Sequence, residues 1–227
     1  MKPFFRDRGY ALGAVILVLF VVSLLQSGIS YTIALGGLRS LEPARVLSLA
    51  EVLVSVRYAL IVFMVVLWAL KRTRALFRVV VFTNSAFTLA LLMQIYTLLT
   101  VLVGISPQAG RTLILDVVLM ALANILIFSI WYWIIDPPGV EEFQRTDEPW
   151  DFLFPQRAGG VPHYDTWVPH YFDYLFLAFT TSFAFSPTDA LPLTRRAKML
   201  MMLQAAISVV TITGIASSAL NALAGSK

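Results

Sequence analysis

The sequence predicts an all-α, polytopic membrane protein with four N-terminal transmembrane helices, a short re-entrant helix and a final transmembrane helix. The first observation behind this is composition. Of 227 residues, 59% are hydrophobic and only 13% are charged, which is too apolar for a soluble domain. The second is that the apolar residues gather in runs, five of which reach the roughly 20 residues that a membrane-spanning helix needs.

The first four spans follow from the order of apolar runs and polar breaks. Lys2, Arg6 and Arg8 precede the first run, which is longer than the apolar core of about 7–15 residues in a signal peptide, so we expect a retained helix. The predicted spans are residues 11–35, 46–70, 79–103 and 112–135. The basic turn 71–78 separates the second and third spans, and Pro-Pro-Gly follows the fourth.

Three regions are expected along the chain. Residues 1–136 form a four-helix transmembrane region, and residues 137–169 form a hydrophilic surface loop that is acidic and rich in aromatic residues. Residues 170–227 hold a short helix and the last span. The apolar run 174–185 is too short to cross a bilayer and is typical of a re-entrant segment. A polar turn at 186–189 then leads to the last predicted span, residues 197–223.

This last region resembles the pore-helix, filter and inner-helix unit of the tetrameric potassium channel superfamily. The residues that carry the resemblance are Phe179-Thr180-Thr181, Asp189, Pro192, Arg196 and the apolar helix after them. The sequence of residues 184–198 is also similar to that of uncharacterised bacterial multipass proteins that are often placed near ion channels. The resemblance covers about a quarter of the chain. It implies a pore loop in which Thr180 and Thr181 end the pore helix, and a homo-oligomer, with a tetramer favoured.

The filter of this unit departs from the family pattern. Ser186, Pro187 and Thr188 stand before Asp189, where potassium channels have Gly, Tyr and Gly. Glycine permits the backbone angles that point carbonyls at the pore axis, whereas proline fixes φ near −65° and removes a donor. We therefore expect no potassium-type selectivity. In the channel interpretation Asp189 attracts cations at the mouth, and in the other it caps a helix or forms a local salt bridge.

Polar residues lie on one face of the last predicted helix. Gln204, Ser208, Thr211 and Ser218 are separated by four, three and seven residues, which keeps them on one side. They are candidates to line a wet pore. The alternative is that small and hydroxyl side chains let neighbouring helices pack closely and hydrogen-bond to one another.

Charged and amide side chains also lie inside the predicted spans. Glu51, Arg57 and Asp116 are expensive at membrane depth and should face protein or water. Glu51 and Arg57 are six residues apart, on opposed faces of a helix, so we do not expect a direct pair between them. Asn84, Gln94 and Asn124 are expected to hydrogen-bond between helices. A proton-relay role and a structural role for Asp116 both stay open.

No enzyme is expected. The chain has no cysteine, which excludes disulfides, thiolate metal sites and cysteine nucleophiles, and no nucleotide or nucleophile-elbow motif is present. His163 and His170, with Asp165 and Asp173, form a weak metal pattern that is commoner as a solvated loop, so we expect neither metal nor cofactor. The net charge of +4 is explained by basic residues flanking helices rather than by a nucleic-acid partner.

The predicted function is an ion-channel-like, multi-pass protein of the cell membrane, the bacterial inner membrane, with the lipid bilayer and monovalent cations as partners. The alternative is a non-conducting membrane scaffold or a small-solute transporter. Lysine and arginine positions place the N-terminus, the 71–78 turn and, after four crossings, the 137–169 loop in the cytoplasm. A potassium-channel-like unit needs that loop outside. Either residues 170–186 cross the membrane fully, which gives six spans, or one of the other predictions is wrong.

Overall fold

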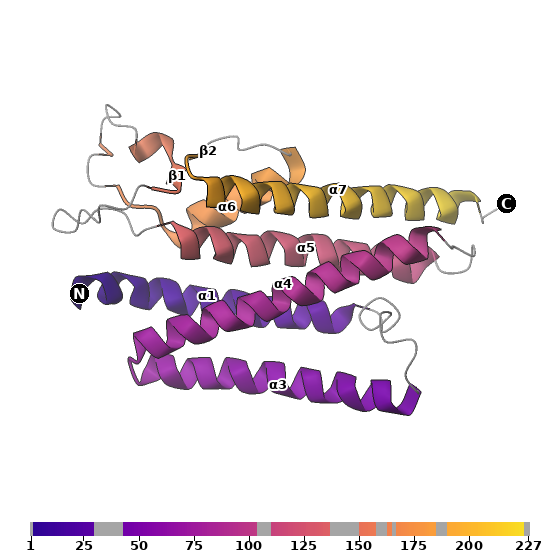
Figure 1. Ribbon diagram of the computed structural model, residues 1–227, viewed down its shortest axis with the longest axis horizontal. Coiled ribbons are helices and arrows are strands. Elements are labelled where there is room, and N and C mark those ends of the chain that lie inside the picture. Colours follow the sequence, from indigo (N-terminus) through magenta and orange to yellow (C-terminus); the bar gives the residue numbers. More distant parts are fainter. Residues whose placement is uncertain are drawn as a thin grey trace.

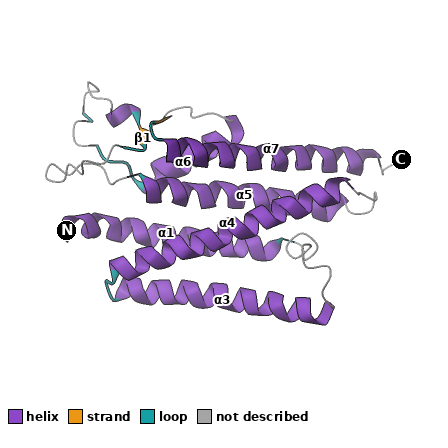
Figure 2. Cartoon of the chain, in the orientation of Figure 1, coloured by secondary structure: helices purple, strands orange, loops and turns teal. Residues whose placement is uncertain are grey.

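A computed structural model gives an elongated bundle of helices (Figure 1). It describes residues 2–29, 43–103, 110–136, 150–157, 163–164, 167–184 and 190–224. The described helices are α1 (Lys2–Gly28), α3 (Pro43–Ala69), α4 (Thr73–Val103), α5 (Gly110–Ile135), α6 (Tyr171–Ala184) and α7 (Arg195–Ala224). Two short strands, β1 (Phe152–Leu153) and β2 (Leu191–Pro192), and the 3₁₀ turn η3 (Pro155–Arg157) complete the described elements. The chain is therefore almost entirely helical where it is described (Figure 2).

Five of the helices are long and apolar enough to cross a membrane, which confirms the predicted number of such segments. They are α1, α3, α4, α5 and α7. Each predicted span overlaps one of them, although α1 ends at Gly28 and the predicted residues 30–35 lie outside the described part of the chain. The sixth helix, α6, has 14 residues and is about 21 Å long at 1.5 Å per residue, against a hydrocarbon core of about 30 Å.

Helix α5 is the centre of the bundle. It packs most extensively on α7, then on α6 and α1, and it also contacts α4 (Figure 1). Helix α3 lies at the edge, against α1 and α4. Tyr132 and Phe128 of α5 are fully buried with their rings edge to face, and Tyr132 meets Phe152 of β1 in the same geometry. The packing of α5 thus joins the four-helix region to the C-terminal region.

One end of the bundle holds most of the described connections. The start of α1, the α3–α4 turn, the β1–β2 pair and the start of α7 all lie there, while the C-terminus lies at the opposite end (Figure 1). Strands β1 and β2 pair in antiparallel register, with Phe152 opposite Pro192 and Leu153 opposite Leu191. The chain entering α6 and the chain leaving it are consequently both tied to this end, which we call the cap end.

Helix α6 has one buried face and one exposed face. Its buried residues recur every three or four positions, which places them on one face. These residues are Tyr171, Tyr174, Leu177, Ala178, Thr181 and Ser182. The opposite face carries four exposed phenylalanines, Phe172, Phe176, Phe179 and Phe183. His170 directly precedes the helix, and its backbone N–H donates to the carboxylate of Asp173 at 2.6 Å.

Candidate functional site

The candidate site is the polar interface that α6 and α7 share with α5, together with the ion pairs that close it at the cap end. Asp136, the residue after α5, is fully buried. Its Oδ1 accepts hydrogen bonds from the backbone N–H of Asp151 at 2.9 Å and of Phe152 at 3.2 Å. Its Oδ2 accepts from Arg157 Nη1 at 2.8 Å and from the Tyr174 hydroxyl at 2.6 Å. One carboxylate therefore joins α5, β1, η3 and α6.

Asp151 is a second buried carboxylate that ties β1 to the start of α7. It accepts from Arg196 Nε at 2.7 Å and Nη2 at 2.6 Å, in a two-pronged pair. It also accepts from the Thr194 hydroxyl, whose oxygen in turn accepts from the N–H of Ala197 at 3.2 Å and so caps α7. The Asp151 backbone carbonyl accepts from the N–H of Leu193 at 2.9 Å. The start of α7 is thereby fixed.

Deeper in the bundle, Gln204 of α7 connects α5 and α6. Its Oε1 accepts a hydrogen bond from the Tyr132 hydroxyl of α5. Its Nε2 donates to the carbonyl of Ala178 at 2.7 Å and to Ser182 Oγ at 2.8 Å, both on α6. Both ends of this amide are used inside one chain. In a medium of low polarity such satisfied networks hold neighbouring helices in one arrangement.

Asn124 of α5 provides the next connection along α7. Its Nδ2 donates to Ser208 Oγ at 2.9 Å and to the Gln204 carbonyl at 3.4 Å. Thr211 donates from its hydroxyl back to its own helix, to the carbonyls of Ile207 at 3.1 Å and Ser208 at 2.9 Å. Three of the four α7 residues predicted as pore-lining candidates are thus buried within the chain, with Gln204 at 0%, Ser208 at 3% and Thr211 at 1% exposure.

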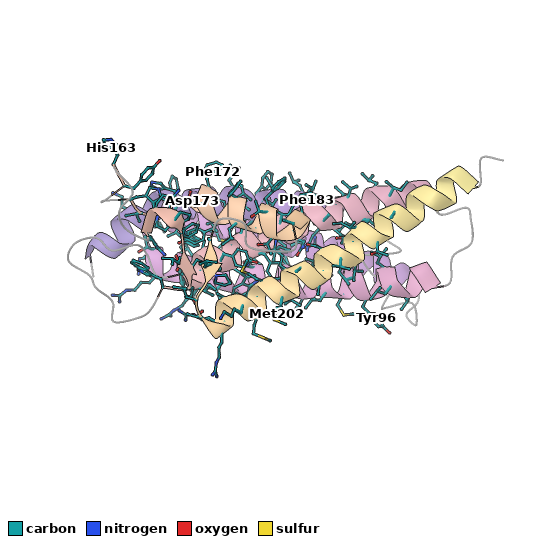
Figure 3. All side chains as sticks on the ribbon, turned by 90° about the horizontal axis from the view of Figure 1, so that it is seen from above. Tyr96, His163, Phe172, Asp173, Phe183 and Met202 are labelled. Carbon is teal, nitrogen blue, oxygen red and sulfur yellow. The ribbon has the colours of Figure 1, made fainter. Side chains whose placement is uncertain are left out.

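Beyond the first turn of α7, most of the exposed described side chains of α6 and α7 are apolar. The exposed side chains of α7 include Met199, Met202, Leu203, Val209 and Ile212. Figure 3 shows Met202 pointing away from α7 on its outer side, and Phe172 and Phe183 at the outer edge of α6. A surface of this kind suits lipid tails or another apolar surface.

Only some of the predicted pore and filter residues lie in the described part of the chain. The hydroxyl of Thr180 donates to the carbonyls of Phe176 and Leu177 at 3.0 and 3.1 Å, and that of Thr181 donates to Leu177 at 2.7 Å. Both therefore bond within α6. Ser186, Pro187, Thr188 and Asp189 lie outside the described residues, as does the side chain of Ser218.

The three predicted intramembrane charges lie on α3 and near the start of α5. Glu51 is exposed on α3, and Arg57 is partly buried there with Nη1 unpartnered among the described residues. Asp116 is buried at 3% exposure near the start of α5. The interhelical hydrogen bonds predicted for Asn84 and Asn124 are confirmed, since Asn84 donates to the Ile127 carbonyl of α5 at 3.2 Å. Gln94 is buried on α4.

A metal centre is not formed by the described side chains, because no three histidine, aspartate or glutamate residues among them come together. His163 and His170 are both exposed. His163 has φ 71°, a left-handed conformation that suits a tight turn. Asp165 lies outside the described residues.

The sequence does not single out the two carboxylates that organise the site. Asp136 directly follows the fourth predicted span, and Asp151 lies in the predicted acidic loop. A signal was available for the first, because an aspartate placed directly after a 22-residue apolar stretch should be either hydrated or paired. Their partners Arg157 and Arg196 lie 21 and 45 residues further on, and no local pattern connects residues so far apart.

Basic residues are distributed unequally between the two ends of the bundle. The described elements at the cap end carry Lys2, Arg6, Arg8, Lys71, Arg72, Arg74, Arg78, Arg157, Arg195, Arg196 and Lys198. The helix starts at the opposite end carry Arg45 and Arg111. Such asymmetry sets the orientation of a multi-pass protein in its membrane.

No known protein family, curated protein or solved structure gives a significant match to this chain, so the site must be interpreted from its own geometry.

Proposed function

We propose that this protein is a non-conducting multi-pass membrane scaffold in which α5, α6 and α7 form one rigid unit. The observation that carries this proposal is the position of Gln204. In the channel interpretation, the polar face of α7 would lie on the outside of each chain and face a shared axis. Gln204 instead bonds Tyr132, Ala178 and Ser182 inside a single chain, and beyond the first turn of α7 its exposed described residues are apolar except Thr213.

Turning this polar face toward a shared axis would be costly. Gln204 would lose its bonds to α5 and α6, and Ser208 would lose its bond to Asn124. The Tyr132 hydroxyl and the Asn124 amide would then be buried without partners, at about 1–3 kcal/mol each. The start of α7 is held as well, by the pair between Arg196 and Asp151. These contacts favour a packed bundle over a lined channel.

The charge asymmetry supports a cytoplasmic cap end. With the cap end inside, α1, α3, α4, α5 and α7 cross alternately, and the C-terminus lies outside. Helix α6 then enters the membrane from the cytoplasmic side and reaches only partway, because it is about 21 Å long. This polarity is the reverse of a potassium channel, whose pore helix enters from outside. It is the second reason for preferring a scaffold.

A cation-conducting protein is the second candidate. It is favoured by the position of the last turn of α6, where Ser182 meets Gln204 in a polar layer inside the bundle. In this version the path would run within one chain rather than along a shared axis. Asp189 would then attract cations at the mouth.

Ion flux separates the two candidates. Purified full-length protein is reconstituted in liposomes that hold a K⁺ or Na⁺ gradient across their membrane. These liposomes should show no more cation flux than protein-free liposomes, and valinomycin is the positive control for K⁺. Asp189→Asn should leave this result and the expression level unchanged. Cation flux that Asp189→Asn or Gln204→Leu alters per molecule would overturn the scaffold proposal and support conduction.

The orientation of the protein in the membrane can be tested by cysteine labelling, because the sequence has no native cysteine that would react in the background. Single cysteines at Gly160, Leu191 and Ser226 are labelled with an impermeant thiol reagent in spheroplasts, Leu191 being exposed. Gly160→Cys and Leu191→Cys should react only after permeabilisation, and Ser226→Cys should react without it. Labelling of Gly160→Cys and Leu191→Cys from opposite faces would mean that residues 170–186 cross the membrane completely.

A further inference from the structure

A cluster of cations lies at the cap end, away from the α5–α6–α7 unit. Lys71, Arg72, Arg74 and Arg78 follow one another within eight residues, on the α3–α4 turn and the first turns of α4, and all four are exposed. We call this cluster the basic corner. In Figure 1 it lies on the opposite side of the bundle from the start of α7.

The backbone of the basic corner is held in one conformation. The N–H of Arg72 donates to the Leu67 carbonyl at 2.9 Å, and the N–H of Lys71 donates to the Trp68 carbonyl at 3.0 Å. With Lys71 at φ 55°, this is the paired-bond motif that ends a helix. The Arg72 carbonyl then accepts from the N–H of Leu76, which starts the hydrogen bonding of α4. The cations are therefore presented from a defined turn.

The depth of the basic corner is indicated by Trp68, three residues before Lys71. Its side chain is 44% exposed, and tryptophan favours the boundary between headgroups and hydrocarbon. A methyl group built on Gly13 of α1 would lie 3.6 Å from the Trp68 ring, so α1 packs directly beside it. Helix α1 extends from there toward its start through Arg8, Arg6 and Lys2, toward the cap end. Positive charge is thus concentrated at headgroup level.

We propose that the basic corner binds the headgroups of anionic phospholipids. The charges of the basic corner and of the lipid headgroup explain this choice of ligand. A phosphodiester at the membrane surface offers negative oxygens to arginine and lysine, and its acyl chains stay in the hydrocarbon beside α3. The exposed apolar face of α3, including Val62, Val65 and Val66, continues from the corner into that hydrocarbon. Headgroup and chains can be contacted together at this site.

Two variants with equal charge change test the site. Arg72→Gln/Arg78→Gln removes two cations from the basic corner. Arg195→Gln/Lys198→Gln removes two exposed cations at the same end, on α7. Neither pair belongs to the buried network of the candidate site. The measurement is energy transfer from tryptophan to dansyl-labelled phosphatidylglycerol, with full-length protein in phosphatidylcholine nanodiscs at physiological salt.

Removing the corner pair should weaken phosphatidylglycerol binding about 25-fold, since each of its two cations contributes about a five-fold factor. The α7 pair should change it less than two-fold. The protein should show no preferential binding of dansyl-phosphatidylcholine. Soluble glycerophosphate at the same phosphate concentration should not displace the bound phosphatidylglycerol. Equal losses in the two variants, equal binding of both lipids, or displacement by glycerophosphate would each overturn the proposal. Unchanged thermal unfolding of both variants is the check on folding.

Discussion

Helices α3 and α5 have the same mean hydropathy but very different positions. In the membrane-compatible window of α3, 17% of residues are buried, whereas in that of α5 the share is 56%. The difference lies in what the polar and aromatic residues do. Asn124, Ser129 and Tyr132 of α5 are buried and bond to α7 and α6. In α3, Glu51 is exposed and valines face outward.

In this bundle, the hydropathy of a helix does not determine how central its position is. Lipid tails are as apolar as leucine, so hydrophobicity alone gives a helix no reason to prefer protein over lipid. Close packing and hydrogen bonds between helices provide that reason. A helix with several satisfied polar side chains is held at the centre, and one without them stays at the edge.

The largest expected effect comes from making the same truncation in both helices. Phe128→Ala on α5 removes a side chain with no exposed surface, and it should lower the free energy of unfolding by about 3–5 kcal/mol. Phe63→Ala on α3, where the side chain is 49% exposed, should cost less than about 1 kcal/mol. Unfolding in mixed micelles, followed by tryptophan fluorescence, measures both. Equal losses would mean that α3 is covered as well as α5, for example by a second copy.

The next effect concerns the ion pair at the end of α5. Asp136→Ala leaves Arg157, whose side chain is only 3% exposed, as an uncompensated buried cation, and it should cost about 3–5 kcal/mol. Asp136→Ala/Arg157→Met removes both charges and should recover most of that loss. The same unfolding experiment gives the coupling energy. A double variant no more stable than Asp136→Ala would show that the carboxylate acts mainly through Tyr174 and the β1 backbone.

A smaller effect is expected in the polar layer between α5, α6 and α7. Gln204→Met keeps a similar volume but leaves the Tyr132 hydroxyl and Ser182 without this partner, which should cost about 1–3 kcal/mol. Met202→Leu, on the exposed face of the same helix, is the matched control and should be neutral. A neutral Gln204→Met would argue that these side chains are hydrated instead, which is what the channel interpretation requires.

The smallest effect tests the edge helix at its end. Lys71 has φ 55°, where a side chain is strained and glycine is not, so Lys71→Gly should stabilise the α3–α4 turn by up to about 1 kcal/mol. Arg72→Gly, in the next position, should instead destabilise slightly. Thermal unfolding of the purified protein distinguishes the two. A destabilised Lys71→Gly would indicate that the lysine side chain itself contributes to the turn.

Much of the fold could be predicted because it depends on local composition. A run of about 20 apolar residues specifies a spanning helix wherever it packs, and the shortness of the 174–185 run separated α6 from the spans. The expected bonding of Asn84 and Asn124 also followed from one property, the cost of an unpaired amide in an apolar medium.

The sequence by itself therefore determined which segments are helices and that polar residues 204, 208 and 211 share one face of α7. It left open whether this face turns toward water or toward other helices, because periodicity defines a face without naming its neighbour. Only the tertiary structure places Gln204 against Tyr132 and Ser182, and Asp136 against Arg157. These contacts join residues 21 to 72 positions apart, and such partners are chosen by the packing of whole helices.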